Sequence, residues 1–324
     1  MCLVAIAIDQ SRQFPLVVAA NRDEFFDRPT QRLGWWSPGA GLPDILGGRD
    51  LKAGGTWLGL TAVGRLALVT NVRDGHTEAD PAAPSRGSIV PLWLRGDLPM
   101  EHFWARVALS GYNGFNVVAA DFQQGVCFWG GNDGSYPVRL QRGIYGLSNA
   151  SLDTPWPKVT TLKQRVAEGI AQAADTAKLA ARLFEALADT QTADDEHLPR
   201  TGVPLPWERT LSPAFIRAPE QRYGTRSSTL IVAERVGRRL FTHVVERSFG
   251  TGTAVALLRQ TTLRDWPPRY TLGTPTRAVA QADVTDGEEI ALSGAPAQRR
   301  RSLLPPAHGR APRASRAGAA SAKA

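Results

Sequence analysis

Two short apolar runs separated by a polar segment open the chain. The first run covers residues 2–8 (CLVAIAI), the second covers 15–20 (PLVVAA), and the polar residues 9–13 lie between them. Runs of this kind joined by turn residues are typical of a β-hairpin. A turn centred near residue 12 makes the numbers of paired residues add up to about 24. The chain is therefore predicted to begin with two antiparallel strands in which Cys2 lies opposite residues 20–24.

Cys2 is a candidate nucleophile because of its place in the chain. Residue 2 is small enough for Met1 to be removed, which leaves a free thiol and a free α-amine on one residue. An α-amino group titrates near ~7.7 to 8.0, so it can accept the thiol proton around neutral pH without a histidine. The alternative is that Cys2 is a small buried apolar side chain.

Four consecutive polar residues, Asn21, Arg22, Asp23 and Glu24, follow the second apolar run. A guanidinium beside a thiol favours the thiolate, a carboxylate can hold an N-terminal ammonium, and an asparagine amide can donate to an oxyanion. Neighbouring residues on a strand point to opposite faces. If Cys2 pairs with Arg22, then Arg22 and Glu24 share the face of the thiol, and Asn21 and Asp23 lie on the other face. A slip of one residue would exchange these roles.

The motif NRDE at 21–24 is accompanied by several others in a fixed order. They are GGRD at 47–50, GGTWLG at 54–59, TNVR at 70–73, YNGFN at 112–116, GLSN at 146–149, Trp156 with Lys158, and YGTR at 223–226. Over roughly residues 1–250 the chain resembles the NRDE-motif family, the transport and Golgi organisation protein 2 group. That family in turn resembles the N-terminal nucleophile hydrolases, in which an N-terminal Cys attacks an amide.

The resemblance implies hydrolysis of a linear amide or an acyl thioester with Cys2 as the nucleophile. Asn71 or Asn149, each expected at a strand end, would donate an amide hydrogen bond to the oxyanion. The likeness to these hydrolases is greatest for their penicillin-acylase and bile-salt-hydrolase branch; Arg226 resembles the second arginine of that branch, and would tune the thiolate or hold an acyl carboxylate. Trp57, next to glycine-rich turns, is a candidate for the substrate pocket together with Arg73 and Tyr223 of the family motifs.

Hairpins, then helices, then further hairpins indicate an α+β protein, an αββα sandwich of two antiparallel sheets with helices outside them. Expected strands cover 56–62, 65–71, 115–120, 126–130, 143–147, 227–234 and 239–245, and expected helices cover 99–109, 157–173 and 176–188. A turn at Val63-Gly64 gives an index sum of about 127 and sets Thr56 opposite Asn71. Residues 74–87 are predicted to form a loop that acts as a lid, and 189–207 a further loop.

A competing hypothesis is a carrier without catalysis. The family has been linked with haem handling and with acyl-lipid homeostasis, so the same pocket would hold haem or an acyl-CoA, with Cys2 as a thiolate ligand or a structural residue. No Cys-Pro haem motif surrounds Cys2, and the amine–thiol pair favours catalysis. No other cofactor is expected, and the five His residues show no metal-ligand spacing.

The net charge of +8 is located almost entirely at one end of the chain. Residues 295–324 contain seven basic and no acidic side chains, whereas the other 294 residues carry 31 basic and 30 acidic ones. We therefore expect a single domain over 1–294, a disordered tail over 295–324, and no nucleic-acid partner. With only Cys2 and Cys127, no apolar run of ~18 residues and no signal peptide, a cytoplasmic protein without a membrane span is expected. Ligand identity and oligomeric state stay open.

Overall fold

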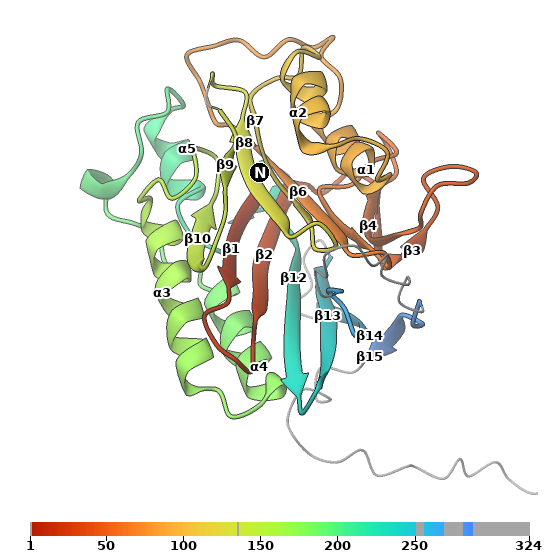
Figure 1. The fold of residues 1–324 in the computed structure, drawn as a ribbon. Coiled ribbons are helices and arrows are strands. Elements are labelled where there is room, and N and C mark those ends of the chain that lie inside the picture. Colours follow the sequence, from red (N-terminus) through yellow and green to blue (C-terminus); the bar gives the residue numbers. More distant parts are fainter. Residues whose placement is uncertain (1, 135, 251–255, 269–280, 288–324) are drawn as a thin grey trace, which may run out of the picture. The chain divides into compact units, whose positions relative to one another are not determined.

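Two antiparallel β-sheets form the centre of the chain (Figure 1). The computed structural model describes residues 2–134, 136–250, 256–268 and 281–287. The first sheet has the order β10 (Gly143–Leu147), β1 (Cys2–Ile8), β2 (Leu16–Phe25), β12 (Tyr223–Val236), β13 (Arg239–Phe249), β14 (Ala256–Arg264) and β15 (Thr285–Gly287), with β11 (Arg217–Ala218) paired to β12. The second has the order β3 (Thr30–Trp36), β4 (Ile45–Asp50), β5 (Leu58–Thr61), β6 (Arg65–Asn71), β7 (Phe115–Asp121), β8 (Val126–Gly131) and β9 (Val138–Arg139).

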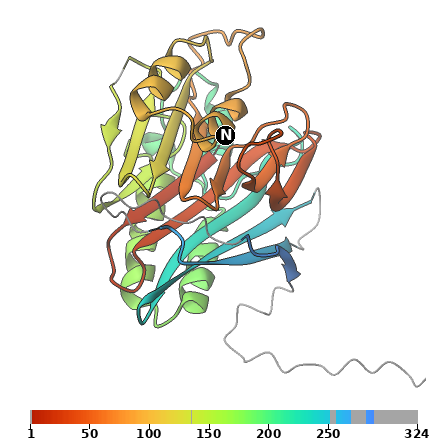
Figure 2. The ribbon, with the colours of Figure 1, turned by 45° about the vertical axis from the view of Figure 1, so that its right-hand side comes forward.

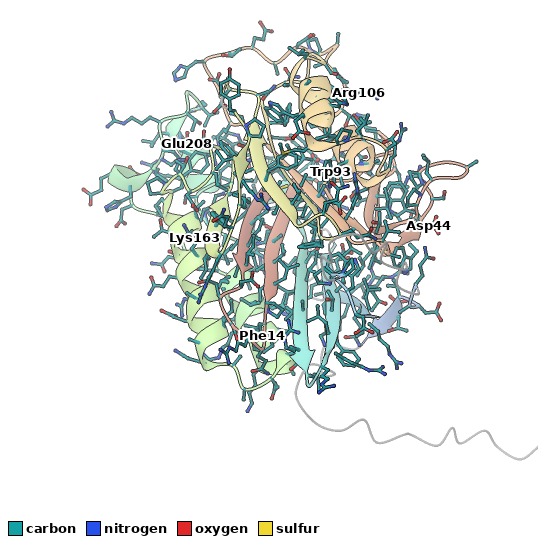
Figure 3. The ribbon with its side chains drawn as sticks, viewed as in Figure 1. Phe14, Asp44, Trp93, Arg106, Lys163 and Glu208 are labelled. Carbon is teal, nitrogen blue, oxygen red and sulfur yellow. The ribbon has the colours of Figure 1, made fainter. Side chains whose placement is uncertain are left out.

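Helices cover the outer face of each sheet (Figure 2). The first sheet packs against α3 (Pro157–Gln172) and α4 (Thr176–Leu187), and the second packs against α1 (Ile89–Leu94) and α2 (Met100–Ala108). A separate apolar cluster fills the space between the two sheets. Phe14 and Trp93, labelled in Figure 3, belong to the two different outer clusters. The predicted αββα sandwich is confirmed.

Strand β1 illustrates why the sequence folds into these layers. Leu3, Ala5 and Ala7 pack in the cluster under α3 and α4, whereas Val4 and Ile6 pack in the cluster between the sheets. Successive side chains on a strand point to opposite faces, so a strand buried on both faces is apolar throughout. Cys2 has the parity of Val4 and therefore lies on the face between the sheets, at the beginning of the strand.

The first predicted hairpin is confirmed in strands and register. Cys2 pairs with Arg22 and Ile8 with Leu16, an index sum of 24 along the whole pair. Strand β2 continues to Phe25, so the four polar residues 21–24 lie inside the strand rather than beyond it. Their side chains consequently alternate between the two faces of the sheet.

The register predicted for the hairpin of β5 and β6 was wrong by one residue. Leu58 pairs with Leu68, an index sum of 126 rather than 127, so Thr56 does not lie opposite Asn71. The reason is the turn: the Gly64 amide donates to the Thr61 carbonyl oxygen, and Gly64 itself has φ +95°. A turn followed by a left-handed glycine places the turn centre before Gly64.

Most other predicted elements are present with shifts of a few residues at their ends. The additional elements are β3, β4, β9, β11, β14, β15, α1, the 3₁₀ turns Arg86–Ser88 and Asp195–His197, and α5 (Leu205–Thr210), which begins inside the predicted loop 189–207. The predicted tail 295–324 lies outside the described residues. Among the helices of the described residues, none has the length and apolar character needed to cross a membrane.

Candidate active site

Cys2 lines a cavity of about 670 Å³ at the rim where the two sheets separate. One wall comes from β2, β12 and β13, the other from β3, β4 and β6, and residues of the segment 80–87 close one side. Of the residues singled out in the sequence, those that line the cavity are Cys2, Arg22, Asp23, Glu24, Trp57, Asn71 and Arg226. The others, Asn21, Arg73, Asn149 and Tyr223, do not line it.

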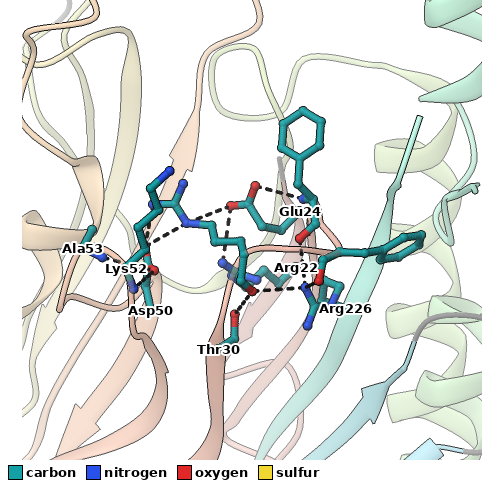
Figure 4. Close-up of polar contacts among 10 residues, drawn as sticks. Arg22, Glu24, Thr30, Asp50, Lys52, Ala53 and Arg226 are labelled. Atoms are coloured by element: carbon teal, nitrogen blue, oxygen red, sulfur yellow. Dashed lines mark hydrogen bonds and ion pairs between the residues drawn. The ribbon is translucent and has the colours of Figure 1, made fainter. Parts of the chain in front are cut away.

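Arg22 and Glu24 lie on the cavity face of β2. The Arg22 Nη2 atom is 3.3 Å from Glu24 Oε2, and this ion pair is drawn in Figure 4. The Arg22 side chain is only 8% exposed, and its Nη1 atom has no hydrogen-bond partner among the described residues. Arg22 therefore presents an unused donor on the same face as the Cys2 thiol across the strand pair.

The charges around Cys2 act on its thiol in both directions. Burial, together with the Asp23 and Glu24 carboxylates, raises the pKa of Cys2 to about 11, although the chain's positive amino terminus and Arg22 act against this rise. Burial of a thiol disfavours its charged form. The cations near Cys2 therefore oppose the effect of burial.

Asn21 and Asp23 have the opposite parity to Arg22 and Glu24 on β2, although Asp23 also borders the cavity. The Asn21 Nδ2 atom donates to the carbonyl oxygens of Leu187 and Ala214, both at 2.8 Å, and Asn21 Oδ1 accepts a hydrogen bond from Ser228 at 2.6 Å. With both N–H groups engaged, Asn21 ties β2 to the end of α4 and to β12.

Asp23 is a buried carboxyl group, 1% exposed. Its Oδ1 atom accepts a hydrogen bond of 2.7 Å from the Thr225 hydroxyl, which in turn accepts one from the Ile216 amide. Burial raises the pKa of Asp23, while Lys158 and the amino terminus lower it. Asp23 thus joins β2 to β12 by a hydrogen bond and interacts electrostatically with Lys158 of α3.

Asn149, Ser148 and Asn71 form a chain of contacts that ends at Cys2. The Asn149 Nδ2 atom donates to the Asn71 carbonyl oxygen at 2.8 Å, and the Ser148 hydroxyl lies 3.0 Å from the Cys2 carbonyl oxygen and 3.2 Å from Asn149 Oδ1. Asn149 is fully buried, whereas Asn71 lines the cavity. Ser148, a member of the GLSN motif, therefore holds the backbone of Cys2.

Arg226 sits at an irregularity of β12, where the pairing with β2 shifts between Thr225 and Ser227. Such a bulge re-aims a side chain. The Arg226 Nη1 atom donates to the carbonyl oxygens of Phe25, Phe26 and Arg28, and its Nε atom has no hydrogen-bond partner among the described residues. Arg226 therefore holds the turn that follows β2 at the edge of the cavity.

Arg73 and Tyr223 lie behind the site in a second polar layer. Arg73 makes a buried ion pair with Glu208 and stacks over the Trp156 ring with its Cζ atom 4.6 Å from the ring centroid. The Tyr223 ring packs edge-on against the Phe25 ring, with the two ring centroids 5.1 Å apart. Burial raises the pKa of the Tyr223 hydroxyl well above its ordinary value. Both residues support the site from outside the cavity.

No role was predicted from the sequence for three charged residues of the site and its surroundings, Lys158, Glu208 and Arg86. Lys158 is buried and donates to the Leu211 carbonyl oxygen at 2.7 Å; burial lowers its pKa to about 8, against the opposing effects of Asp23 and Cys2. Its signal was available, because a lysine four residues before the buried Leu162 falls on the apolar face of a helix. Glu208 and Arg86 gave no such signal in the sequence.

The segment 74–87 is held at both ends. The Gly75 amide donates to Thr201, Asp80 and Asn113 exchange two hydrogen bonds of 2.9 Å, and the Thr56 amide donates to the Gly87 carbonyl oxygen at 3.0 Å. Its residue Arg86 lines the cavity and donates from Nη1 to the Gly114 carbonyl oxygen at 2.9 Å. The predicted loop is present; its action as a lid stays a prediction.

No group of three or more His, Cys, Asp or Glu side chains in the described part of the chain is placed to hold a metal ion. Cys127 lies on β8 and is partly buried; burial raises its pKa to about 12. Of the two cysteines, only Cys2 lines the cavity.

Two solved structures overlap with this chain. One is an N-acylethanolamine-hydrolyzing acid amidase ortholog from Caenorhabditis elegans, 11% identical with a TM-score of 0.42, which covers 71% of this chain and 92% of that chain. The other is a mutant conjugated bile acid hydrolase from Clostridium perfringens, 8% identical with a TM-score of 0.39, which covers 89% and 97%. Because both TM-scores are low, the fold assignment rests on the sheets and helices of this chain.

The sequence comparisons are more specific. The chain is 33% identical over 260 residues to the transport and Golgi organization 2 homolog of Mus musculus, and 32% identical over 262 residues to the Homo sapiens homolog, covering in each case 75% of this chain and 92% of the relative. The Drosophila melanogaster protein is 29% identical over 280 residues and covers 74% and 90%. The model of the family "Transport and Golgi organisation 2" matches residues 1–250. The chain belongs to the transport and Golgi organisation 2 family.

Proposed function

We propose that this protein hydrolyses a linear amide or an acyl thioester, with Cys2 as an N-terminal nucleophile after removal of Met1. The observation that carries the proposal is the position of Cys2 opposite Arg22 at the end of β1, where its thiol lines a cavity of about 670 Å³. An α-amine on the same residue would complete a nucleophile and base within one amino acid.

In the proposed reaction the α-amine of Cys2 takes the thiol proton, and the sulfur attacks the carbonyl carbon of the substrate. A C–S bond forms as the carbonyl oxygen becomes an oxyanion. The C–N or C–S bond to the leaving group then breaks, and the leaving group takes the proton from the α-ammonium. Water, deprotonated by the same amine, hydrolyses the acyl-enzyme and restores the thiol.

The surrounding residues have distinct roles in this proposal. Arg22 stabilises the thiolate through its unused Nη1 donor. The Asn71 side chain, which makes no hydrogen bond within the described residues, is the oxyanion donor from the cavity wall, and Asn149 holds Asn71 in place through its carbonyl. Asp23, on the strand paired with that of Cys2, would attract the α-ammonium of the processed chain.

A second candidate function is a carrier of haem or an acyl-CoA without catalysis. In its favour is the burial of Cys2, which is only 6% exposed and whose thiol pKa is thereby raised to about 11, because a thiol that stays protonated at pH 7 is a poor nucleophile. In either case the two unpaired cysteines suit a reducing compartment such as the cytoplasm.

Intact mass after reaction with a thiol-directed acylating probe tests the proposal. The processed chain is expected to lack Met1 and to gain one acyl group that is then lost by hydrolysis. Cys2→Ala should gain none, and Cys127→Ser, the control, should behave as the wild type. Cys2→Ser should keep the fold while turnover of N-acyl or acyl-thioester substrates falls by orders of magnitude. Retention of Met1, or haem or acyl-CoA binding unaffected by Cys2→Ala with no hydrolysis of any acyl substrate, would favour the carrier.

A further inference from the structure

The cavity beside Cys2 carries more basic than acidic side chains. Its lining includes seven basic residues, Arg22, Arg28, Arg32, Arg49, Lys52, Arg86 and Arg226, and five acidic ones, Asp23, Glu24, Asp50, Asp80 and Glu246. Burial raises the pKa of two of these acids, Asp23 and Glu246. The chain outside the tail is nearly neutral, so the positive excess belongs to the cavity and not to the body of the protein.

Four of the basic residues, Arg22, Arg28, Arg86 and Arg226, interact electrostatically with the same carboxylate, Glu24, and we call these four the arginine corner. Two carboxylates pair with these side chains: Glu24 lies 3.3 Å from Arg22 and 3.7 Å from Arg28, and Asp50 lies 2.6 Å from Arg28 (Figure 4). Arg86 and Arg226 make no ion pair within the described residues. Four guanidiniums therefore share two paired carboxylates.

The two arginines without an ion pair use few of their donors. Arg86 donates one hydrogen bond, from Nη1 to the Gly114 carbonyl oxygen, and all three hydrogen bonds of Arg226 come from Nη1. A guanidinium offers five N–H groups and accepts none. The remaining donors of Arg86 and Arg226, with Nη1 of Arg22, have no acceptor in the described part of the chain.

Arg86 brings the corner close to the reacting atom. It reaches the cavity from the segment 80–87 and lines it together with Cys2 and Arg22. Burial lowers the pKa of Arg86, and the charges of Cys2 and Glu24 act against this. An acceptor bound by Arg86 would thus lie beside the nucleophile.

We infer that the ligand of this cavity carries a compact anionic group, a carboxylate or a phosphate, which binds in the arginine corner through Arg86 and the unused donors of Arg226 and Arg22. Planar guanidinium forks match the oxygens of both groups. The inference deepens the proposed function by naming the charge class of its substrate, but it concerns binding and holds for a carrier as well.

A pair of reagents that differ only in charge tests the inference. Iodoacetate is anionic and iodoacetamide is neutral, and both alkylate the same Cys2 thiolate, so the ratio of their rates cancels any change in the thiol pKa. We expect the ratio of the iodoacetate rate to the iodoacetamide rate at Cys2 to be about tenfold higher in the native protein than in the urea-unfolded chain. Arg86→Gln should bring it close to the unfolded value. Arg139→Gln, a matched control whose guanidinium also bonds one backbone carbonyl oxygen, should keep the native ratio.

Competition identifies the anion. Inorganic phosphate and acetate, compared at equal ionic strength, should slow alkylation of Cys2 in the wild type and not in Arg86→Gln. Stronger protection by phosphate assigns a phosphate-bearing ligand, and stronger protection by acetate assigns a carboxylate. A native ratio no higher than that of the unfolded chain, or one unchanged in Arg86→Gln, overturns the inference.

A second measurement decides the matter if Cys2 reacts with neither reagent. Thermal unfolding of Cys2→Ala with inorganic phosphate or acetate should show a rise in Tm that Arg86→Gln removes, because a ligand of the native state stabilises it. An equal rise in both proteins, or none in either, contradicts the anion site. Neither measurement requires turnover, so a failed hydrolysis assay leaves the result intact.

Discussion

Cys2 and Arg22 face each other across the first two strands, on the side that looks into the space between the sheets. The pairing leaves one Arg22 nitrogen, Nη1, buried and without a partner in the described residues, while Nη2 pairs with Glu24. A buried donor without a partner is costly. A thiolate at Cys2 would offer an acceptor on this face.

Replacement of Arg22 is expected to weaken the thiolate. In a Cys127→Ser background, Arg22→Ala should raise the pKa of Cys2, since a nearby cation is lost, and slow its alkylation at pH 7 by about tenfold. Arg22→Lys keeps the charge, so its alkylation rate should lie between the rates of the wild type and of Arg22→Ala. Alkylation rates with iodoacetamide from pH 6 to 11 report the relative amount of thiolate at each pH. An unchanged rate profile in Arg22→Ala would mean that the guanidinium does not act on the thiol.

Asp23→Asn is expected to act mainly on stability. The change weakens the bond from the Thr225 hydroxyl and leaves Lys158 buried with less compensation, which should lower the free energy of unfolding by about 1–3 kcal/mol. Urea denaturation at pH 7 measures this. A large shift in the pKa of Cys2 with unchanged stability would show that Asp23, and not Arg22, is coupled to the thiol.

The buried Lys158 side chain is expected to make the free energy of unfolding depend on pH. Its pKa is about 8 in the folded chain against 10.5 for an ordinary lysine, so between these values the unfolded chain binds more protons. The contribution of Lys158 to the free energy of unfolding therefore rises with pH across this window. Lys158→Met should remove that rise, seen as a difference from the wild type in urea denaturation at pH 7.5, 9 and 10.5. Lys178→Met, with a side chain 67% exposed, is the control and should keep it.

Close backbone contact predicts that Gly55 and Gly87 respond differently to the same substitution. A Cβ at Gly55 would lie 2.2 Å from the Gly87 carbonyl oxygen, whereas a Cβ at Gly87 meets nothing closer than 3.5 Å. Gly55→Ala should therefore lower the free energy of unfolding by about 1–3 kcal/mol and displace the segment that carries Arg86. Gly87→Ala should change stability by less than about 1 kcal/mol. Thermal unfolding compares them, and equal Tm values would mean that this contact is not tight.

Several features of this protein were readable in the chain because they depend on local pattern. The alternation of apolar residues and the length of the first turn determine the hairpin register, and with it the division of residues 21–24 between two faces. The helices followed from the spacing of apolar residues. The turn at Gly64 was misjudged, since a left-handed glycine extends a turn by one residue without any other mark in the sequence.

Tertiary structure alone decided how distant charges meet. Arg86 follows a polar loop with no periodicity, Glu208 sits in a short helix, and Arg226 is re-aimed by a bulge, so no local pattern relates them to Cys2. Their positions depend on how the two sheets pack and where their rims separate, a consequence of contacts between residues far apart in the chain. The candidate nucleophile and the strand that faces it could be identified from local pattern, because both lie within one hairpin. Packing of the two sheets determined the cavity, the arginine corner and the raised pKa of the thiol, because burial and charge proximity arise only when those sheets come together.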